Sequence, residues 1–130
     1  MSILVAVYGS LRKTQGNHRL LDGEGVSFIK TATIEGYDLF PYAGISFPCI
    51  AKGENKVVVE IYSVDPTTFK RLDGLEGYPS FYNREQVQVE GLDDQPWIYY
   101  HEQPPSRMKP IKHGDWLRYK KEIISDADIS

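Results

Sequence analysis

Glu76 holds the position in this sequence that most needs a chemical explanation. Phe69, Leu72 and Leu75 precede it at helical spacing. On a helix of 3.6 residues per turn, Glu76 falls on the face that these residues define. We expect that face to point into the core, where a carboxylate must be paired, hydrogen-bonded or used in chemistry. A structural partner, either Arg84 or a backbone N–H group, and a catalytic role are therefore both open.

A second candidate is the tight turn at Tyr8-Gly9-Ser10-Leu11. The residues from Ile3 to Tyr8 are almost all apolar, which predicts a buried strand that enters a turn at Gly9 and Ser10. Such a turn is either a plain chain reversal or an anion-binding loop. In the second case its backbone N–H groups would face a carboxylate or an oxyanion.

The helix that carries Glu76 has recognisable ends. Asp65 suits the N-cap and Pro66 the first helical position, and the helix is expected to run to about Leu75, with Gly77 just past its end. Glu76 would then lie near the negative end of the helix macrodipole. Burial and that dipole both disfavour the anion and raise the pKa of the carboxyl group. A glutamate tuned in this way can accept and return protons near neutral pH.

Other kinds of catalytic site have less support. No histidine lies at a metal-ligand spacing from Cys, Asp or Glu, and no Gly-x-Gly-x-x-Gly fingerprint occurs. Cys49 has no nucleophile motif and is expected to be a small buried hydrophobe. Ser10 lacks the second glycine of a nucleophile elbow. Glu60 is a rival carboxylate, but its position in the middle of a strand predicts that it is exposed or paired.

The surrounding elements predict an α+β domain. Many short strands with two or three short flanking helices favour a small, mostly antiparallel, mixed β-barrel. We expect one domain over residues 1–122 and a flexible C-terminal tail over 123–130. The predicted strands cover residues 3–8, 25–34, 57–64, 84–90 and 97–101, and the last two are expected to form a hairpin. Residues 53–55 are expected to form a turn. Asn17 could cap a short helix, and a last helix is expected to open at residues 114–119.

Composition limits the kinds of partner. The chain has 130 residues, a net charge of −3 and no basic block, so we expect neither a nucleic acid nor a membrane partner. The apolar run Ile3 to Val7 is too short for a signal peptide core. A single cysteine fits a reducing compartment, so a cytoplasmic location is expected. A small-molecule substrate fits these limits, and both a monomer and a homodimer remain open.

Taken together, the two candidate motifs resemble the gamma-glutamylcyclotransferase superfamily, which includes AIG2-like and BtrG-like proteins. The stretch from Leu11 to Leu20 looks most like the gamma-glutamylamine cyclotransferase branch. The matching segments occur in family order through almost the whole chain: Val5 to Leu11, Gly16 to His18, Glu60 to Tyr62, Leu72 to Tyr78 with Tyr82 and Arg84, and Gly114 to Trp116.

The resemblance implies a barrel with flanking helices and no cofactor. The family's general acid/base corresponds to Glu76, and its substrate-binding turn corresponds to Tyr8, Gly9, Ser10 and Leu11. The implied reaction is intramolecular: the α-amine of a γ-glutamyl group attacks its own γ-amide and yields 5-oxoproline and a free amine or amino acid. Tyr82 and Arg84 are near enough in sequence to line or brace the pocket.

Two alternatives remain open from the sequence. The first is a non-catalytic module that keeps the family pocket and binds a small metabolite or a protein. Glu76 argues against it, because a pure binder has no need for a buried, destabilising acid. The second is a related lyase-type reaction on a γ-glutamylated antibiotic or another modified amine.

Overall fold

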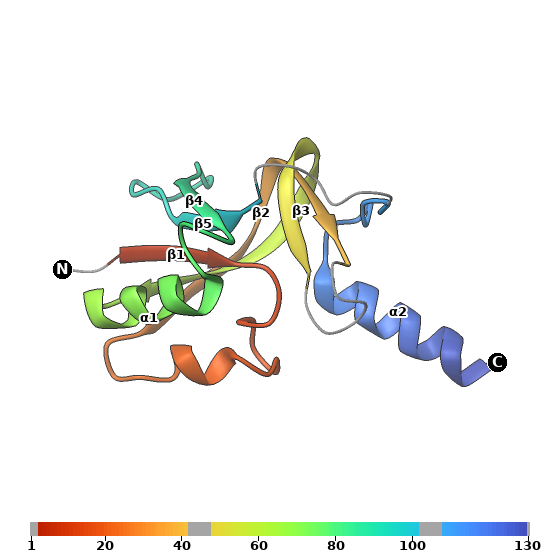
Figure 1. The fold of residues 1–130 in the computed structure, drawn as a ribbon, viewed down its shortest axis with the longest axis horizontal. Coiled ribbons are helices and arrows are strands. Elements are labelled where there is room, and N and C mark those ends of the chain that lie inside the picture. Colours follow the sequence, from red (N-terminus) through yellow and green to blue (C-terminus); the bar gives the residue numbers. More distant parts are fainter. Residues whose placement is uncertain (1–2, 42–47, 102–107, 130) are drawn as a thin grey trace.

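The computed structural model describes residues 3–41, 48–101 and 108–129. A sheet of five strands in the order β2-β3-β1-β5-β4 forms its centre (Figure 1). Strands β1 and β5 run parallel, whereas β1–β3, β2–β3 and β4–β5 are antiparallel. The strands are β1 (Ile3–Val7), β2 (Ser27–Phe40), β3 (Cys49–Val64), β4 (Asn83–Gln86) and β5 (Trp97–Tyr100), and the helices are η1 (His18–Leu21), α1 (Pro66–Glu76) and α2 (Trp116–Ile129). The predicted α+β class and mixed sheet are confirmed.

The sheet is not closed into the predicted barrel. Strands β2 and β4 lie at opposite ends of the strand order, and no ladder joins them in the described part of the chain. Register shifts in the β2–β3 pair, between Glu35 and Tyr37 for example, mark irregularities of the kind that bend strands. The first residues of β3 reach the end of β5, where Ala51 bridges His101 and the His101 N–H donates to the Ile50 carbonyl at 2.8 Å. The sheet therefore curves towards closure without completing it.

The predicted turn at residues 53–55 is wrong, because β3 continues through it. Asp38 on the neighbouring strand accepts hydrogen bonds from the backbone N–H of Asn55 and, at 2.7 Å, from its side-chain Nδ2. A side chain at Gly53 would collide with the Asp38 carboxylate. This carboxylate satisfies two donors of Asn55 and so supports an extended chain at this point.

The hairpin of β4 and β5 forms as predicted, but β4 is shorter than the alternation suggests. It ends at Gln86, although Val87 and Val89 are still buried. The Val87 N–H donates to the Pro96 carbonyl at 2.9 Å, and the Leu92 N–H donates to Val89 at 3.1 Å. Val87 and Val89 therefore pack into the core although they lie beyond the last residue of β4.

Local sequence chemistry sets both ends of α1. Asp65 accepts the Thr68 N–H at 2.9 Å and Pro66 is the first helical residue, while Gly77 ends the helix with φ of 66°. That positive φ is one that glycine adopts without strain. Helix α2 runs to Ile129, beyond the predicted domain boundary at residue 122. That boundary and the flexibility of the tail stay predictions.

The helices cover different parts of the sheet. Helices α1 and η1 lie side by side below β1, and α2 lies at the other end of the molecule (Figure 1). Strand β1 contributes Ala6 to one buried cluster, and Val5 and Val7 to a second cluster that includes Leu72 of α1. Burial on both faces explains why β1 is almost continuously apolar. Cys49 is a free, buried thiol as predicted, and burial raises its pKa to about 12.

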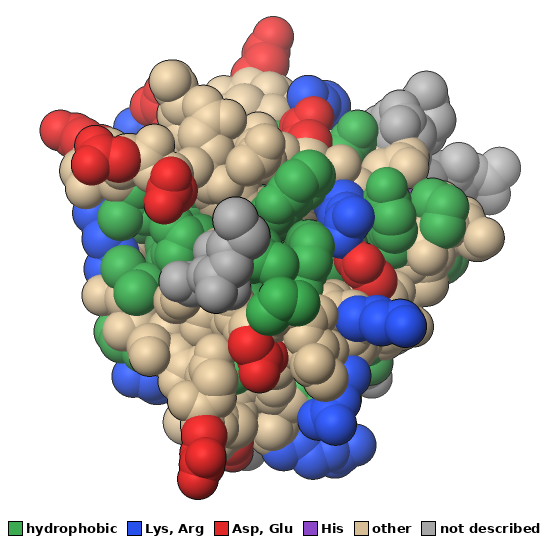
Figure 2. All heavy atoms as spheres, turned by 90° about the vertical axis from the view of Figure 1, so that its left-hand side faces the viewer, with side chains coloured by type: hydrophobic (Ala, Val, Ile, Leu, Met, Phe, Trp, Pro, Cys, Tyr) green, Lys and Arg blue, Asp and Glu red, His purple; other side chains and the backbone are tan. Residues whose placement is uncertain are grey.

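The face of the molecule drawn in Figure 2 carries mixed charge. Figure 2 shows hydrophobic side chains gathered on one face, interrupted by both Lys or Arg and Asp or Glu side chains, with no broad area of one sign. None of the helices in the described ranges is long and apolar enough to cross a membrane.

Candidate functional site

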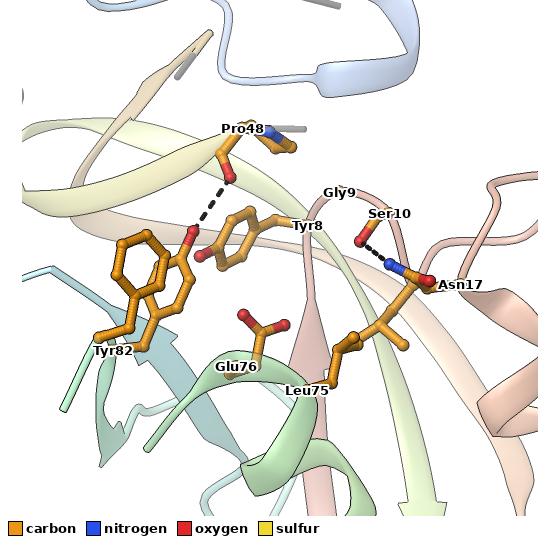
Figure 3. Close-up of a pocket in the computed structure, with 10 residues that line it drawn as sticks. Tyr8, Gly9, Ser10, Asn17, Pro48, Leu75, Glu76 and Tyr82 are labelled. Carbon is orange, nitrogen blue, oxygen red and sulfur yellow. Dashed lines mark hydrogen bonds between the residues drawn. The ribbon is translucent and has the colours of Figure 1, made fainter. Parts of the chain in front are cut away.

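A cavity of about 250 Å³ lies between the end of α1 and the turn that follows β1. Glu76 reaches it from the helix, and Tyr8 to Leu11 reach it from the turn (Figure 3). All the site residues predicted from the sequence therefore line one cavity, although 68 positions separate the two motifs. The complete lining is Tyr8, Gly9, Ser10, Leu11, Asn17, Pro48, Leu75, Glu76, Phe81 and Tyr82.

The Glu76 carboxylate points from the end of α1 towards Tyr8 (Figure 3). Within the described residues it accepts no hydrogen bond and forms no ion pair, and burial raises its pKa to about 7. The structural alternative of pairing with Arg84 does not occur, because Arg84 Nη1 lies 2.8 Å from both carboxylate oxygens of Asp73. Glu76 is thus an acid with a raised pKa and no protein partner in the described part of the chain.

The helical face that carries Glu76 is only partly buried. Leu72 is fully buried, as its spacing predicts, whereas Leu75 is 42% exposed. Leu75 lines the cavity together with the exposed Phe81. The expectation that Leu75 points into the core is wrong, because the end of α1 borders a cavity and not a packed layer.

The turn after β1 is held close to Pro48. A Cβ atom at Gly9 would lie 2.5 Å from both Cδ and Cγ of the Pro48 ring, so a larger residue does not fit without movement. The Arg12 N–H closes the turn by donating to the Gly9 carbonyl at 2.9 Å. The N–H groups of Gly9, Ser10 and Leu11 have no acceptor among the described residues. Three consecutive donors along the cavity can therefore bind an anionic group.

Asn17 organises the same turn. Its backbone N–H donates to the Ser10 carbonyl at 2.9 Å, and its side-chain Nδ2 donates to Ser10 Oγ at 3.0 Å. Asn17 does occupy the N-cap position of η1, but its side chain makes no capping bond there. The prediction that the Asn17 side chain caps the helix is therefore wrong, because this side chain donates its hydrogen bond to Ser10 Oγ instead.

Two tyrosines close the inner side of the cavity. The Tyr8 hydroxyl donates to the Tyr99 carbonyl at 2.9 Å, and the Tyr82 hydroxyl donates to the Pro48 carbonyl at 3.3 Å. Burial, with the neighbouring ionisable groups of Tyr82 and Glu76, raises the pKa of Tyr8 well above its usual value. Tyr8 is thus a neutral phenol at physiological pH.

Several lining residues are not among the predicted site residues. Asn17, Pro48, Leu75 and Phe81 come from four segments that meet only in the folded chain. Tyr82, which the sequence places near enough to line or brace the pocket, does line it. Arg84, which has the same nearness in sequence, does not line the cavity and instead holds Asp73.

No metal or second acid enters this geometry. In the ranges that the structure describes, no group of three or more His, Cys, Asp or Glu side chains could hold a metal ion. Glu60 lies away from the cavity lining and is 4% exposed. Of its two sequence predictions the paired one is correct, because Arg12 Nε donates to it at 2.8 Å.

The residues that build this cavity lie within a segment that matches a known protein family. The family model described as "Gamma-glutamyl cyclotransferase, AIG2-like" matches residues 5–118, which include both sides of the cavity. The chain belongs to the gamma-glutamyl cyclotransferase, AIG2-like family. The resemblance predicted from the motifs is therefore confirmed.

Relatives in this family are similar over nearly their whole length. The gamma-glutamylcyclotransferase family protein YtfP of Escherichia coli K12 is 30% identical over 113 residues, which cover 87% of this chain and 95% of YtfP. The crystal structure of the uncharacterized protein PH0828 from Pyrococcus horikoshii has a TM-score of 0.79 and 32% identity, covering 95% of this chain and 98% of that one. An AIG2-like protein (GGACT) from Mus musculus has a TM-score of 0.74 and 26% identity, covering 88% and 87%. Like these relatives, the chain has the fold of the gamma-glutamyl cyclotransferase, AIG2-like family.

Proposed function

We propose that this protein is a γ-glutamyl cyclotransferase with Glu76 as its general acid/base. The free α-amine of a γ-glutamyl group attacks the carbon of its own γ-amide carbonyl and forms a C–N bond. The bond between that carbon and the amide nitrogen then breaks. The products are 5-oxoproline and a free amine or amino acid, and the reaction consumes no water and uses no cofactor.

One observation carries the proposal: Glu76 has no partner among the described residues and faces the Tyr8–Leu11 turn across one cavity. The substrate amine is largely a cation near pH 7, because the pKa of an α-amino group is about 8. It must lose a proton before it attacks, and the departing nitrogen must gain one. A carboxyl group with a pKa of about 7 can take the first proton and supply the second.

The turn supports the other requirement, which is orientation. The backbone N–H groups of Gly9, Ser10 and Leu11 are available to the substrate α-carboxylate or to the oxyanion that develops on the γ-carbonyl oxygen. Closure of a five-membered ring needs no external nucleophile. A correctly folded glutamyl chain supplies much of the rate, because well-oriented intramolecular reactions reach effective molarities of about 10⁵ M or more.

The test is a panel of γ-glutamyl amines and γ-glutamyl amino acids, with release of 5-oxoproline as the measured product. We expect at least one compound to turn over in the wild type. In Glu76→Gln, turnover should fall by about 10²–10⁴-fold, because an amide cannot relay the proton. The change is nearly isosteric, so binding and the fold should persist.

Glu35→Gln is the matched control, since the Glu35 side chain is 77% exposed and away from the cavity. Its turnover should equal that of the wild type. Full activity in Glu76→Gln would refute the mechanism. If no γ-glutamyl compound turns over but one of them still raises Tm, the family pocket serves binding, as a ligand that binds only the native state stabilises it.

A further inference from the structure

Asp73, one helical turn before Glu76, is fixed through both its backbone and its side chain. Its carbonyl accepts the N–H of Tyr78 at 3.0 Å and the N–H of the C-cap residue Gly77. Its carboxylate accepts two hydrogen bonds from Arg84 at 2.8 Å and one from the Tyr99 hydroxyl at 2.6 Å. The end of α1 is therefore tied to β4, β5 and the following loop through the residue three positions before the acid.

Arg84 is itself held in place by aromatic rings. Its guanidinium carbon lies 4.4 Å from the ring centre of Phe69, 4.3 Å from Tyr78 and 4.9 Å from Trp97. These distances are within the range of cation–π attraction. Rings from α1, from the loop that follows it and from β5 thus keep the Arg84 charge on Asp73, so that it does not neutralise Glu76.

Tyr99 connects the two walls of the cavity. Its hydroxyl donates to Asp73 on the side of the acid, and its backbone carbonyl accepts the Tyr8 hydroxyl at 2.9 Å on the side of the turn. Tyr99 does not line the cavity, yet it is 3% exposed and lies on the central part of the sheet. One buried residue therefore forms hydrogen bonds towards both walls.

We infer that Asp73, Arg84 and Tyr99 form a positioning unit that holds Glu76 at a fixed place opposite the Tyr8–Leu11 turn. The inference rests on the proposed function for its effect on turnover, but not for its effect on Glu76 itself. When the unit is loosened, the last turn of α1 frays and the Glu76 carboxylate, now half-buried, becomes more exposed to water. Because burial is what disfavours the anion, its pKa must then fall.

Tyr99→Phe is the most selective test, since it removes one hydroxyl and keeps the ring and the carbonyl that Tyr8 uses. A ¹³C NMR titration of the Glu76 carboxyl group, without substrate, should give a pKa lower by about one unit, towards the usual value of about 4.3. With a compound that turns over, kcat should fall about tenfold or more while KM changes little, because a misplaced acid slows the chemical step.

Tyr62→Phe is the matched control. The Tyr62 hydroxyl also donates to a carboxylate, Glu60 Oε1, at 2.8 Å, and it is outside the cavity lining. This variant should lower Tm to a similar extent and leave both the Glu76 titration and turnover unchanged. Asp73→Asn serves as a second variant of the positioning unit, because its amide keeps the shape and loses the charge that holds Arg84; its Glu76 pKa should also fall.

The inference is overturned if Tyr99→Phe and Asp73→Asn lower Tm but leave the Glu76 titration at its wild-type midpoint. The three residues would then only stabilise the fold. Failure of every γ-glutamyl compound to turn over would count against the proposed function alone, because the NMR titration needs no substrate.

Discussion

Two glutamates in this protein are withdrawn from the open surface, Glu60 buried and Glu76 half-buried, and they show opposite behaviour. Glu60 on β3 accepts hydrogen bonds from Arg12 Nε, the Lys13 N–H and the Tyr62 hydroxyl, all at 2.8–2.9 Å. Burial by itself would raise the pKa of Glu60, but these bonds and the Arg12 charge lower it below its usual value. Glu76 has no such donors in the described chain, and burial raises its pKa to about 7.

The difference teaches that burial alone does not decide what an acid does. Where donors converge on a carboxylate, it stays ionised and serves as a structural link. Arg12 joins Glu60 to Asp115 at the start of α2, also at 2.8 Å, and so ties the loop after β1 to the far end of the molecule. Where donors are missing, as at Glu76, the acid can exchange protons near neutral pH.

The largest effect on stability is expected from breaking the ion pair between Arg12 and Glu60. Arg12→Met keeps much of the side-chain volume but leaves Glu60 buried without its cation. We expect the free energy of unfolding at pH 7 to fall by about 3–5 kcal/mol, as for other buried ion pairs that lose one partner. Urea unfolding followed by circular dichroism measures this.

Lys52→Met is the control, because Lys52 pairs with Glu85 at 2.8 Å with its own side chain 60% exposed. Its loss should cost less than about 1 kcal/mol. Equal losses in the two variants would contradict a special role for the Arg12–Glu60 pair.

A smaller effect of opposite sign is expected at Glu76. The folded-state pKa of about 7 lies above the unfolded value of about 4.3, so the ionised carboxylate destabilises the fold. This penalty is absent below the unfolded pKa, grows as the pH rises, and is complete above the folded pKa. Glu76→Gln should therefore raise the free energy of unfolding by about 2 kcal/mol at pH 8 and leave it nearly unchanged at pH 4.

Urea titrations of both proteins at pH 4, 6 and 8 test this sign. A Gln variant that is less stable than the wild type at pH 8 would mean that Glu76 has a stabilising partner. The contrast with Glu60 would then disappear.

The smallest effect is expected in the loop after β1, which contacts Glu60 through Arg12 and lines the Glu76 cavity through its first residues. Asn17→Ala removes the donor to Ser10 Oγ but leaves the Arg12 contacts intact. One such hydrogen bond is worth about 1 kcal/mol. We therefore expect kcat/KM to fall about fivefold and the free energy of unfolding to fall by no more than about 1 kcal/mol. Steady-state kinetics with a turned-over γ-glutamyl compound measures it, and an unchanged kcat/KM would show that the turn is rigid without Asn17.

The ends of α1 could be predicted because Asp65, Pro66 and Gly77 act within one turn of the helix. The cavity itself could be anticipated only in part. Motifs at Tyr8 and Glu76 were visible, but the contribution of Pro48 depends on how β3 bends towards β5. Sequence periodicity reports which face is apolar and contains no information on such bends.

Partners far apart in the chain were also beyond sequence reasoning. Glu60 and Arg12 are 48 positions apart, so a mid-strand glutamate could be either exposed or paired until the register of β1 and β3 was known. The same applies to Asp73, whose partners Arg84 and Tyr99 come from β4 and β5. Long-range strand pairing fixes these contacts, whereas helix caps are local.

The most direct test of the contrast is one ¹³C NMR titration that follows the carboxyl groups of Glu76 and Glu60 in the same wild-type sample. A midpoint of about 7 for Glu76 and a midpoint below the usual glutamate value for Glu60 are predicted. A Glu76 midpoint at or below the ordinary value of about 4.3 would contradict its role as the proton-transferring acid.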